Sequence, residues 1–173
     1  YNRIDARAND EGRFDFPVVA PGEQRLSCEA EGFAPSVRKI QVPKDEIGIL
    51  LDIGLDRGST LTGRLLDADG EGVEGLYLST LTHPKSGQRG EYLSRRTRSD
   101  AEGRFRIEHL PGGLVQVEVY GGSYRRHLEK GVPSDKTDLE IRLQQSAKLA
   151  GRVVDALTGA PIRKFRIRLG STA

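Results

Sequence analysis

The chain has 173 residues, with 27 Lys and Arg against 25 Asp and Glu, so its net charge of +2 gives no strong field for nucleic acid or acidic lipid. Hydrophobic residues make up 36% of the chain, enough for a core, but no run approaches the roughly 18 apolar residues of a membrane-spanning helix. With 21 Gly, 8 Pro, no Trp and no Met, the composition favours a turn-rich, all-β architecture.

The middle of the chain, residues 57–144, predicts about seven short strands separated by turns, which is the pattern of a β-sandwich. Alternation of apolar and polar residues places Phe105 and Ile107 in the core, and Val115, Val117 and Val119 on one face of a later strand. The strands that the pattern places, in chain order, are 61–66, 76–80, 93–98, 104–107, 115–119 and 139–143.

The connections carry turn residues and polar loops. Asp67-Ala68-Asp69-Gly70 predicts a hairpin-like reversal, and the turn at 99–103 is predicted to make its two flanking strands neighbours. Residues 82–90 read as a long polar loop, and residues 43–48 hold one turn of helix at most.

The chain also repeats itself with a period of about 90 residues, which is the size of a domain. Residues 10–16 recur as 101–107 after 91 positions, 51–55 recur as 139–143 after 88, and 61–68 recur as 149–156 after 88.

This period divides the chain into three parts joined by short linkers. Residues 57–144 form one complete β-sandwich repeat, residues 1–56 carry the C-terminal part of a first repeat, and residues 145–173 carry the N-terminal part of a third. Partial repeats leave apolar residues such as Phe14 and Phe165 without a covering sheet. Two alternatives follow: the two ends complete each other as a permuted domain, or residues outside this chain complete them.

Four motifs in the complete repeat carry a family resemblance. They are Gly63 to Gly70 (GRLLDADG), Ser99 to Phe105 (SDAEGRF), Leu110-Pro111-Gly112 and Gly122-Ser123-Tyr124. The chain resembles the carboxypeptidase regulatory-like domain family, whose pattern is G-x-V-x-D, T-D-x-x-G-x-F, L-P-x-G and G-Y. Ser99 stands where the family usually has Thr, and Ser123 is inserted between the last Gly and Tyr.

The resemblance implies tandem seven-stranded Greek-key β-sandwiches of the prealbumin-like (transthyretin-like, Ig-like) type, related to carbohydrate-binding-like modules. Such modules often occur in bacterial envelope or secreted proteins, so an extracellular or cell-envelope location is expected. In carboxypeptidases the module accompanies a catalytic domain without performing the chemistry, and the resemblance therefore transfers no catalytic residue.

The sequence predicts neither a metal site nor a cofactor. Cys28 is the only cysteine, so no disulfide can form within the chain. It lies in a segment where apolar and polar residues alternate, which predicts that it is a small buried residue of a strand. The histidines lack metal-ligand spacing; they stand at positions 83, 109 and 127.

An acidic cluster, Asp67, Asp69 and Glu71, resembles the start of a calcium loop, but Leu78 occupies the twelfth position, where a bidentate Glu is needed. We interpret the cluster as a turn, and the alternative is a weak calcium site built from these three carboxylates.

Arginine is the noticeable excess. If two strands neighbour each other across the 99–103 turn, their arginines form one basic face, which Arg89 in the adjoining loop would extend. The alternative is a solvated face balanced by glutamates. The candidate ligand face comprises Arg95, Arg96, Arg98, Arg104, Arg106, Tyr120 and Tyr124.

The leading hypothesis is a non-catalytic spacer and interaction module of a larger surface or secreted protein, with neighbouring domains of the same chain as its partners. A second hypothesis is a glycan- or peptidoglycan-binding module, which an exposed, coplanar pair of tyrosines would favour. A third makes the array the accessory part of a hydrolase whose catalytic domain lies outside these residues. Nucleic acid is not an expected partner, whereas a polysaccharide or a protein remains one.

Overall fold

The structure, a computed structural model, describes residues 4–44, 48–82 and 93–170. Most of the predicted polar loop at 82–90 and half of the segment 43–48, which was expected to hold one helical turn at most, lie outside the described residues. Within them, no helix has the length and apolar character needed to cross a membrane.

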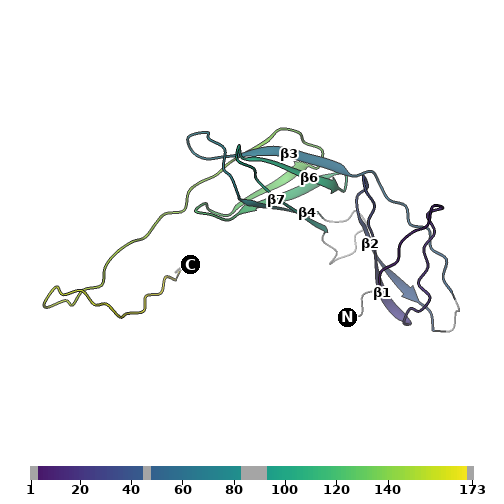
Figure 1. Cartoon of the computed structure of the whole chain (residues 1–173), viewed down its shortest axis with the longest axis horizontal. Coiled ribbons are helices and arrows are strands. Elements are labelled where there is room, and N and C mark those ends of the chain that lie inside the picture. Colours follow the sequence, from purple (N-terminus) through teal and green to yellow (C-terminus); the bar gives the residue numbers. More distant parts are fainter. Residues whose placement is uncertain (1–3, 45–47, 83–92, 171–173) are drawn as a thin grey trace.

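The middle of the chain folds as a two-layered β-sandwich of seven strands (Figure 1). One sheet has the order β6-β3-β9 and the other has the order β5-β4-β7-β8. All neighbours are antiparallel except β3 and β9, which run parallel. The strands are β3 (Ser59–Leu66), β4 (Tyr77–Thr82), β5 (Leu93–Arg98), β6 (Arg104–Leu110), β7 (Leu114–Tyr120), β8 (His127–Pro133) and β9 (Leu139–Arg142). The all-β sandwich predicted from the sequence is confirmed.

The core lies between the two sheets and follows the predicted alternation. Phe105, Ile107 and the valines at 115, 117 and 119 are all buried. They pack with aliphatic residues of the other strands, chiefly Leu61, Leu65, Leu76, Leu78, Leu110, Leu139 and Ile141. Burial of these side chains is the main stabilising contribution to the sandwich.

The two connections predicted to be hairpin-like instead cross from one sheet to the other. β3 and β4 lie in different sheets, as do β5 and β6, so the strands that flank the 99–103 turn are neighbours across the sandwich and not within one sheet. A tight turn rich in Asp and Gly fits both arrangements, and strands that each bury one apolar face can pack across a core as well as within one sheet.

The first flank, residues 4–44 and 48–56, contains one hairpin, in which β1 (Gly22–Cys28) pairs with β2 (Ser36–Val42). The last flank, residues 145–170, extends from the sandwich without forming a strand. Figure 1 places these flanks at opposite ends of the sandwich, so within one molecule they do not complete each other as a permuted domain.

Local structure in both flanks reproduces that of the complete unit. Asn9 accepts the N–H groups of Glu11 and Arg13 through its side chain, as Asp100 accepts those of Glu102 and Arg104. The positions of the two turns differ by 91 residues, the offset seen in the sequence.

The second shared turn begins at Asp67 in the complete unit and at Asp155 in the last flank. Each carboxylate accepts two backbone N–H groups of its own turn. The N–H and hydroxyl groups of Thr158, with the N–H of Leu157, lower the pKa of the Asp155 carboxyl below its ordinary value.

Gly63 is required by the packing of β3 between its two neighbours. It lies opposite both Phe105 of β6 and Leu139 of β9. A Cβ atom at this position would overlap the Leu139 carbonyl oxygen and lie 2.7 Å from the Phe105 ring. We therefore expect Gly63→Ala to lower the free energy of unfolding by about 2 to 3 kcal/mol, measured by urea denaturation.

The matched control is Gly112→Ala, because Gly112 has an ordinary backbone conformation and no atom within 4 Å of an added Cβ. This substitution is expected to be nearly neutral. Equal effects of the two substitutions would contradict the role assigned to Gly63.

Candidate functional site

The predicted ligand face is divided between the outer surfaces of two different sheets. Arg104 and Arg106 belong to β6 of the three-stranded sheet, whereas Arg96, Arg98 and Tyr120 belong to the four-stranded sheet. β5 and β6 are therefore not neighbours within one sheet, although Arg98, Arg104 and Arg106 line the same open groove.

Arg95 and Tyr124 lie elsewhere. The guanidinium of Arg95 is 3.9 Å from the Glu29 carboxylate of the first flank, and its Nε is buried without a hydrogen-bond partner among the described residues. Tyr124 packs against the core and its backbone forms a bridge with Gln145 of the last flank. Both residues therefore lie at the junctions between parts of the chain. Arg89, which was expected to extend the basic face, lies outside the described residues.

On the four-stranded sheet, three side chains form a cross-strand stack. Arg98, Tyr77 and Tyr120 are direct partners across β5, β4 and β7. The tyrosine rings are stacked, with centroids 5.8 Å apart and planes at 20°, and the Arg98 guanidinium lies over Tyr77 at 5.2 Å from the ring centroid. Arg98 Nε also donates to the Gly75 carbonyl at 2.8 Å.

This stack occupies the ring faces of Tyr77, although 47% of the residue is exposed. β5 and β7 lie on opposite sides of β4, so Arg98 covers one face of the ring and Tyr120 the other. Cation–π and aromatic contacts of this kind stabilise neighbouring strands. Tyr77 is exposed and Tyr120 is half-buried, and the two rings are stacked on each other, so they do not form the exposed, coplanar pair that the carbohydrate hypothesis requires.

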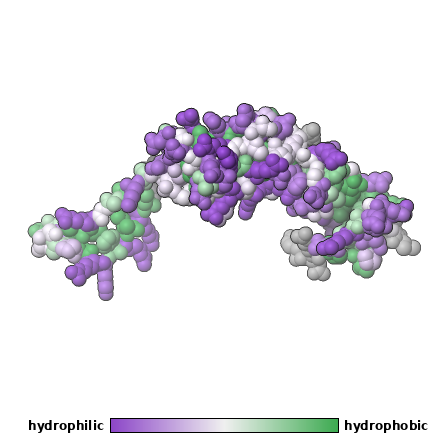
Figure 2. Space-filling model, turned by 45° about the horizontal axis from the view of Figure 1, so that its top comes forward, coloured by the Kyte–Doolittle hydropathy of each residue, from purple (hydrophilic) through white to green (hydrophobic). Residues whose placement is uncertain are grey.

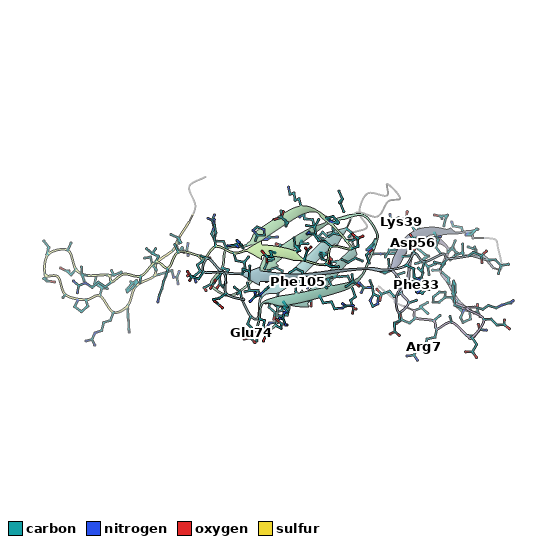
Figure 3. The ribbon with its side chains drawn as sticks, turned by 90° about the horizontal axis from the view of Figure 1, so that it is seen from above. Arg7, Phe33, Lys39, Asp56, Glu74 and Phe105 are labelled. Atoms are coloured by element: carbon teal, nitrogen blue, oxygen red, sulfur yellow. The ribbon has the colours of Figure 1, made fainter. Side chains whose placement is uncertain are left out.

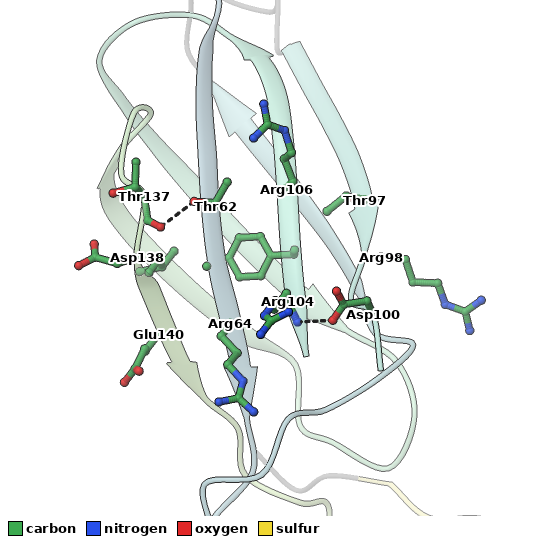
Figure 4. A pocket seen from close by; sticks show the side chains of 13 residues that line it. Thr62, Arg64, Thr97, Arg98, Asp100, Arg104, Arg106, Thr137, Asp138 and Glu140 are labelled. Atoms are coloured by element: carbon green, nitrogen blue, oxygen red, sulfur yellow. Dashed lines mark hydrogen bonds between the residues drawn. The ribbon is translucent and has the colours of Figure 1, made fainter. Parts of the chain in front are cut away.

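An open groove runs over the three-stranded sheet (Figure 4). The cations that line it are Arg64, Arg98, Arg104 and Arg106. Its acidic residues are Asp100, Asp138, which directly precedes β9, and Glu140 on β9. Figure 4 shows that the long side chains spread in different directions, with Arg98 directed away from the others.

Most of these polar groups have structural partners. Arg64 donates to the Glu102 carbonyl at 2.7 Å and Thr62 donates to the Thr137 carbonyl at 2.7 Å. Arg106 pairs with Glu108. The groove therefore resembles a charge-balanced sheet surface more than a site built for an anion. Arg64 and Thr62 were not singled out from the sequence, because only strand pairing places them beside β6.

The remaining candidate side chains that the structure describes lie in turns or on strands. The Asp67 carboxylate caps its own turn, consistent with the turn interpretation, and the Glu129 carboxylate lies 3.1 Å from His127. Cys28 is half-buried on β1. In the described ranges no three His, Cys, Asp or Glu side chains converge as metal ligands would. His83 lies outside those ranges.

The stack predicts a difference between two neighbouring arginines. Arg98→Ala removes the contact with Tyr77 and the hydrogen bond to Gly75, so we expect a loss of about 1 to 2 kcal/mol in the free energy of unfolding. Arg96→Ala is the matched control on the same strand and is expected to cost less than about 0.5 kcal/mol, because Arg96 is exposed. Thermal and urea unfolding provide the comparison, and equal losses would contradict the structural role of the stack.

Comparisons with solved structures give partial likenesses of low identity. A hydroxyquinol 1,2-dioxygenase from Pseudomonas putida is 13% identical with a TM-score of 0.43, and the match covers 51% of this chain and 57% of that one. A streptococcal ancillary pilin is 15% identical with a TM-score of 0.34, covering 67% and 39% of the two chains. The TIE protein of Bacillus anthracis is 15% identical with a TM-score of 0.37, covering 80% and 28%.

A likeness at this level carries no functional information, and the chain spans little more than half of the dioxygenase that it resembles. No curated protein matches the chain. The family comparison is specific, however, because the model of the carboxypeptidase regulatory-like domain matches residues 60–144, which span nearly the whole seven-stranded sandwich. The resemblance to the carboxypeptidase regulatory-like domain family that the sequence motifs indicated is therefore confirmed over residues 60–144.

Proposed function

We propose that the chain is a segment of a tandem array of non-catalytic β-sandwich modules that holds other parts of a larger surface or secreted protein at a fixed spacing. The repeats are those expected from the sequence, with 57–144 complete and with 1–56 and 145–173 as parts of a first and a third repeat. The observation that carries the proposal is the parallel pairing of β3 with β9.

Parallel pairing of the first and last strands gives the module a direction. The chain enters at the start of β3 and leaves at the end of β9, and in a parallel pair these points lie at opposite ends. Successive modules are therefore displaced along one line, and Figure 1 shows the two flanks at the two ends of the sandwich. This geometry suits a spacer.

The junction between the first flank and the sandwich is fixed by several contacts. Phe33 forms a backbone bridge with Arg57, flanked by hydrogen bonds from Ala34 N–H to the Asp56 carbonyl at 2.9 Å and from Gly58 N–H to the Gly32 carbonyl at 3.0 Å. The Arg57 guanidinium lies 4.8 Å from the centroid of the Phe33 ring. We call this arrangement the clasp. Figure 3 shows Phe33 and Asp56 where the flank meets the sandwich.

A second clasp occurs at the other end of the sandwich. Tyr124 forms a bridge with Gln145, Arg125 N–H donates to the Gln144 carbonyl at 2.9 Å, and Ser146 N–H donates to the Ser123 carbonyl at 2.7 Å. Phe33 and Tyr124 are 91 positions apart, as the repeat requires. Each clasp ties the linker to the unit before it, which limits the swing of the unit that follows.

The carbohydrate hypothesis has less support. Sugar rings stack on free aromatic faces, whereas Tyr77 is covered on both faces by Arg98 and Tyr120. The accessory role beside a hydrolase is compatible with a spacer and requires a catalytic domain elsewhere.

The spacer function is tested by the distance between the first flank and the sandwich. Spin labels at Arg25→Cys and Glu140→Cys, in a Cys28→Ser background, report this distance by pulsed electron paramagnetic resonance. We expect a narrow distribution that broadens in Phe33→Ala, because the contact with Arg57 is lost. Glu31→Ala, an exposed substitution beside the clasp, should leave it narrow. A broad distribution before any clasp substitution would refute the spacer proposal.

A glycan-array screen separates the two functions. Under the spacer proposal we expect no binding that depends on Tyr120. Binding that Tyr120→Ala abolishes, with an unchanged β-sheet circular dichroism spectrum, would establish the carbohydrate function in its place.

A further inference from the structure

One glycine allows the first flank and the sandwich to meet closely at their junction. A Cβ atom at Gly58 would lie 2.8 Å from the Cα atom of His109 in the sandwich and 3.2 Å from the carbonyl carbon of Phe33 in the first flank. Both atoms belong to the backbone, so no side-chain rotation would make room for the added carbon. The hydrogen atom of Gly58 therefore lets the backbones of the two units approach the same point.

Further contacts of the first flank add to this junction. Ala34 is 6% exposed and Pro35 is buried as well. The Glu29 carboxylate lies 3.9 Å from the guanidinium of Arg95 on β5. The first flank thus presents two small apolar residues and one acid to the sandwich.

The junction after the sandwich has the same backbone pattern but different residues. Each clasp consists of one bridge and two flanking hydrogen bonds, and the paired positions differ by 91 residues in the repeat and by 88 in the linker. The equivalents are Ser146 for Gly58, Arg125 for Ala34, Arg126 for Pro35 and Tyr120 for Glu29.

Two of these replacements remove contacts that the first junction uses. Ser146 has the Cβ atom for which the first junction has no room at Gly58. Tyr120 has no carboxylate to offer a following unit, and its ring is stacked on Tyr77. The Glu29 ion pair therefore has no counterpart at this position.

The two arginines exclude close packing more strongly. Arg125 and Arg126 are exposed and add to a sandwich surface that is mainly hydrophilic in the view of Figure 2. Arg126 pairs with Glu118 of the same sandwich, and Arg125 donates to the Gln144 side chain. Guanidinium groups cannot take the buried places of two small apolar residues without new partners, because burial of an unpaired charge is costly.

We propose that the residues at positions 34, 35 and 58 decide whether consecutive repeats dock on each other. The first repeat and the sandwich then move as one body, and the array bends at the junction after the sandwich. The docking surface of the sandwich, formed by Arg57, Gly58, Arg95 and His109, fits a preceding repeat that presents small apolar residues and an acid. The second clasp still fixes where the following repeat begins, but it does not fix its orientation.

This inference rests on the proposed function, since it concerns consecutive repeats of one array. It adds that the two junctions differ in stiffness.

Transplanting residues of the second junction into the first tests the inference. Ala34→Arg and Gly58→Ser are introduced separately into the chain that carries spin labels at positions 25 and 140. The parent should give a narrow distance distribution, and each substitution should broaden it, because each inserts atoms into a closely packed contact. A distribution that stays narrow in either variant overturns the inference.

Matched controls add the same side chains where the structure leaves room. Ala30→Arg changes an exposed position four residues before Ala34. Gly54→Ser changes an exposed position of the segment before Gly58, with no atom within 4 Å of the added Cβ. Both controls should leave the distribution narrow, and equal broadening in the controls overturns the inference.

The thermal transition of the central sandwich is recorded for every variant. If Gly58→Ser unfolds the sandwich at the temperature of the measurement, Ala34→Arg decides alone, because residue 34 lies in the first flank. Across the second junction, labels at Glu140→Cys and Leu157→Cys should give a broad distribution in the parent, and a narrow one overturns the bend.

The two proposals fail in different ways. A broad distribution across the first junction of the parent refutes the spacer function. A narrow parent distribution that Ala34→Arg leaves unchanged overturns only the role of the junction residues, and the spacer function stands.

Discussion

The close approach of three strands at Gly63 is the constraint on which the rest of the structure depends. With a hydrogen atom in place of a side chain, β3 accommodates the Phe105 ring from β6 and the backbone of Leu139 from β9 on its two sides. This approach allows β9 to join β3 in parallel and to complete the sheet. The parallel pair in turn separates the entry and exit of the chain, which gives the module an axis and places each flank at its own end. The packing around Gly63 and the separation of the two flanks therefore have one origin.

The outer surfaces contribute to the same architecture. Arg98 covers Tyr77 and also donates to Gly75 at the start of the segment leading into β4, while Arg64 donates to Glu102 in the turn before β6. Exposed arginines that contact aromatic rings and carbonyl groups add to stability through both packing and charge. Arg64 and Arg98 therefore have structural roles in the two sheets.

Sequence reasoning succeeded where the signal was local and failed where it depended on pairing. Phe105, Ile107 and the valines of β7 alternate strictly, and this period of two predicts their burial directly. The turn at 99–103 was located correctly, but its residues form the same capping hydrogen bonds whether the chain stays in one sheet or crosses to the other.

For that reason the sequence did not show that β5 and β6 present their arginines from two different sheets, or that Arg95 lies near Glu29 at a junction. β8 was not located, because His127 to Pro133 has no clear alternation, and the clasp was missed because its pairing joins residues 24 positions apart. Repeats add a further constraint on such a chain: similar cores allow the strands of one repeat to pack on another, so covalent linkage and its high local concentration must favour the correct partner. Equivalent core positions differ between the repeats; Leu169, for example, corresponds to Thr80. Such differences make a strand pack less well on the wrong repeat.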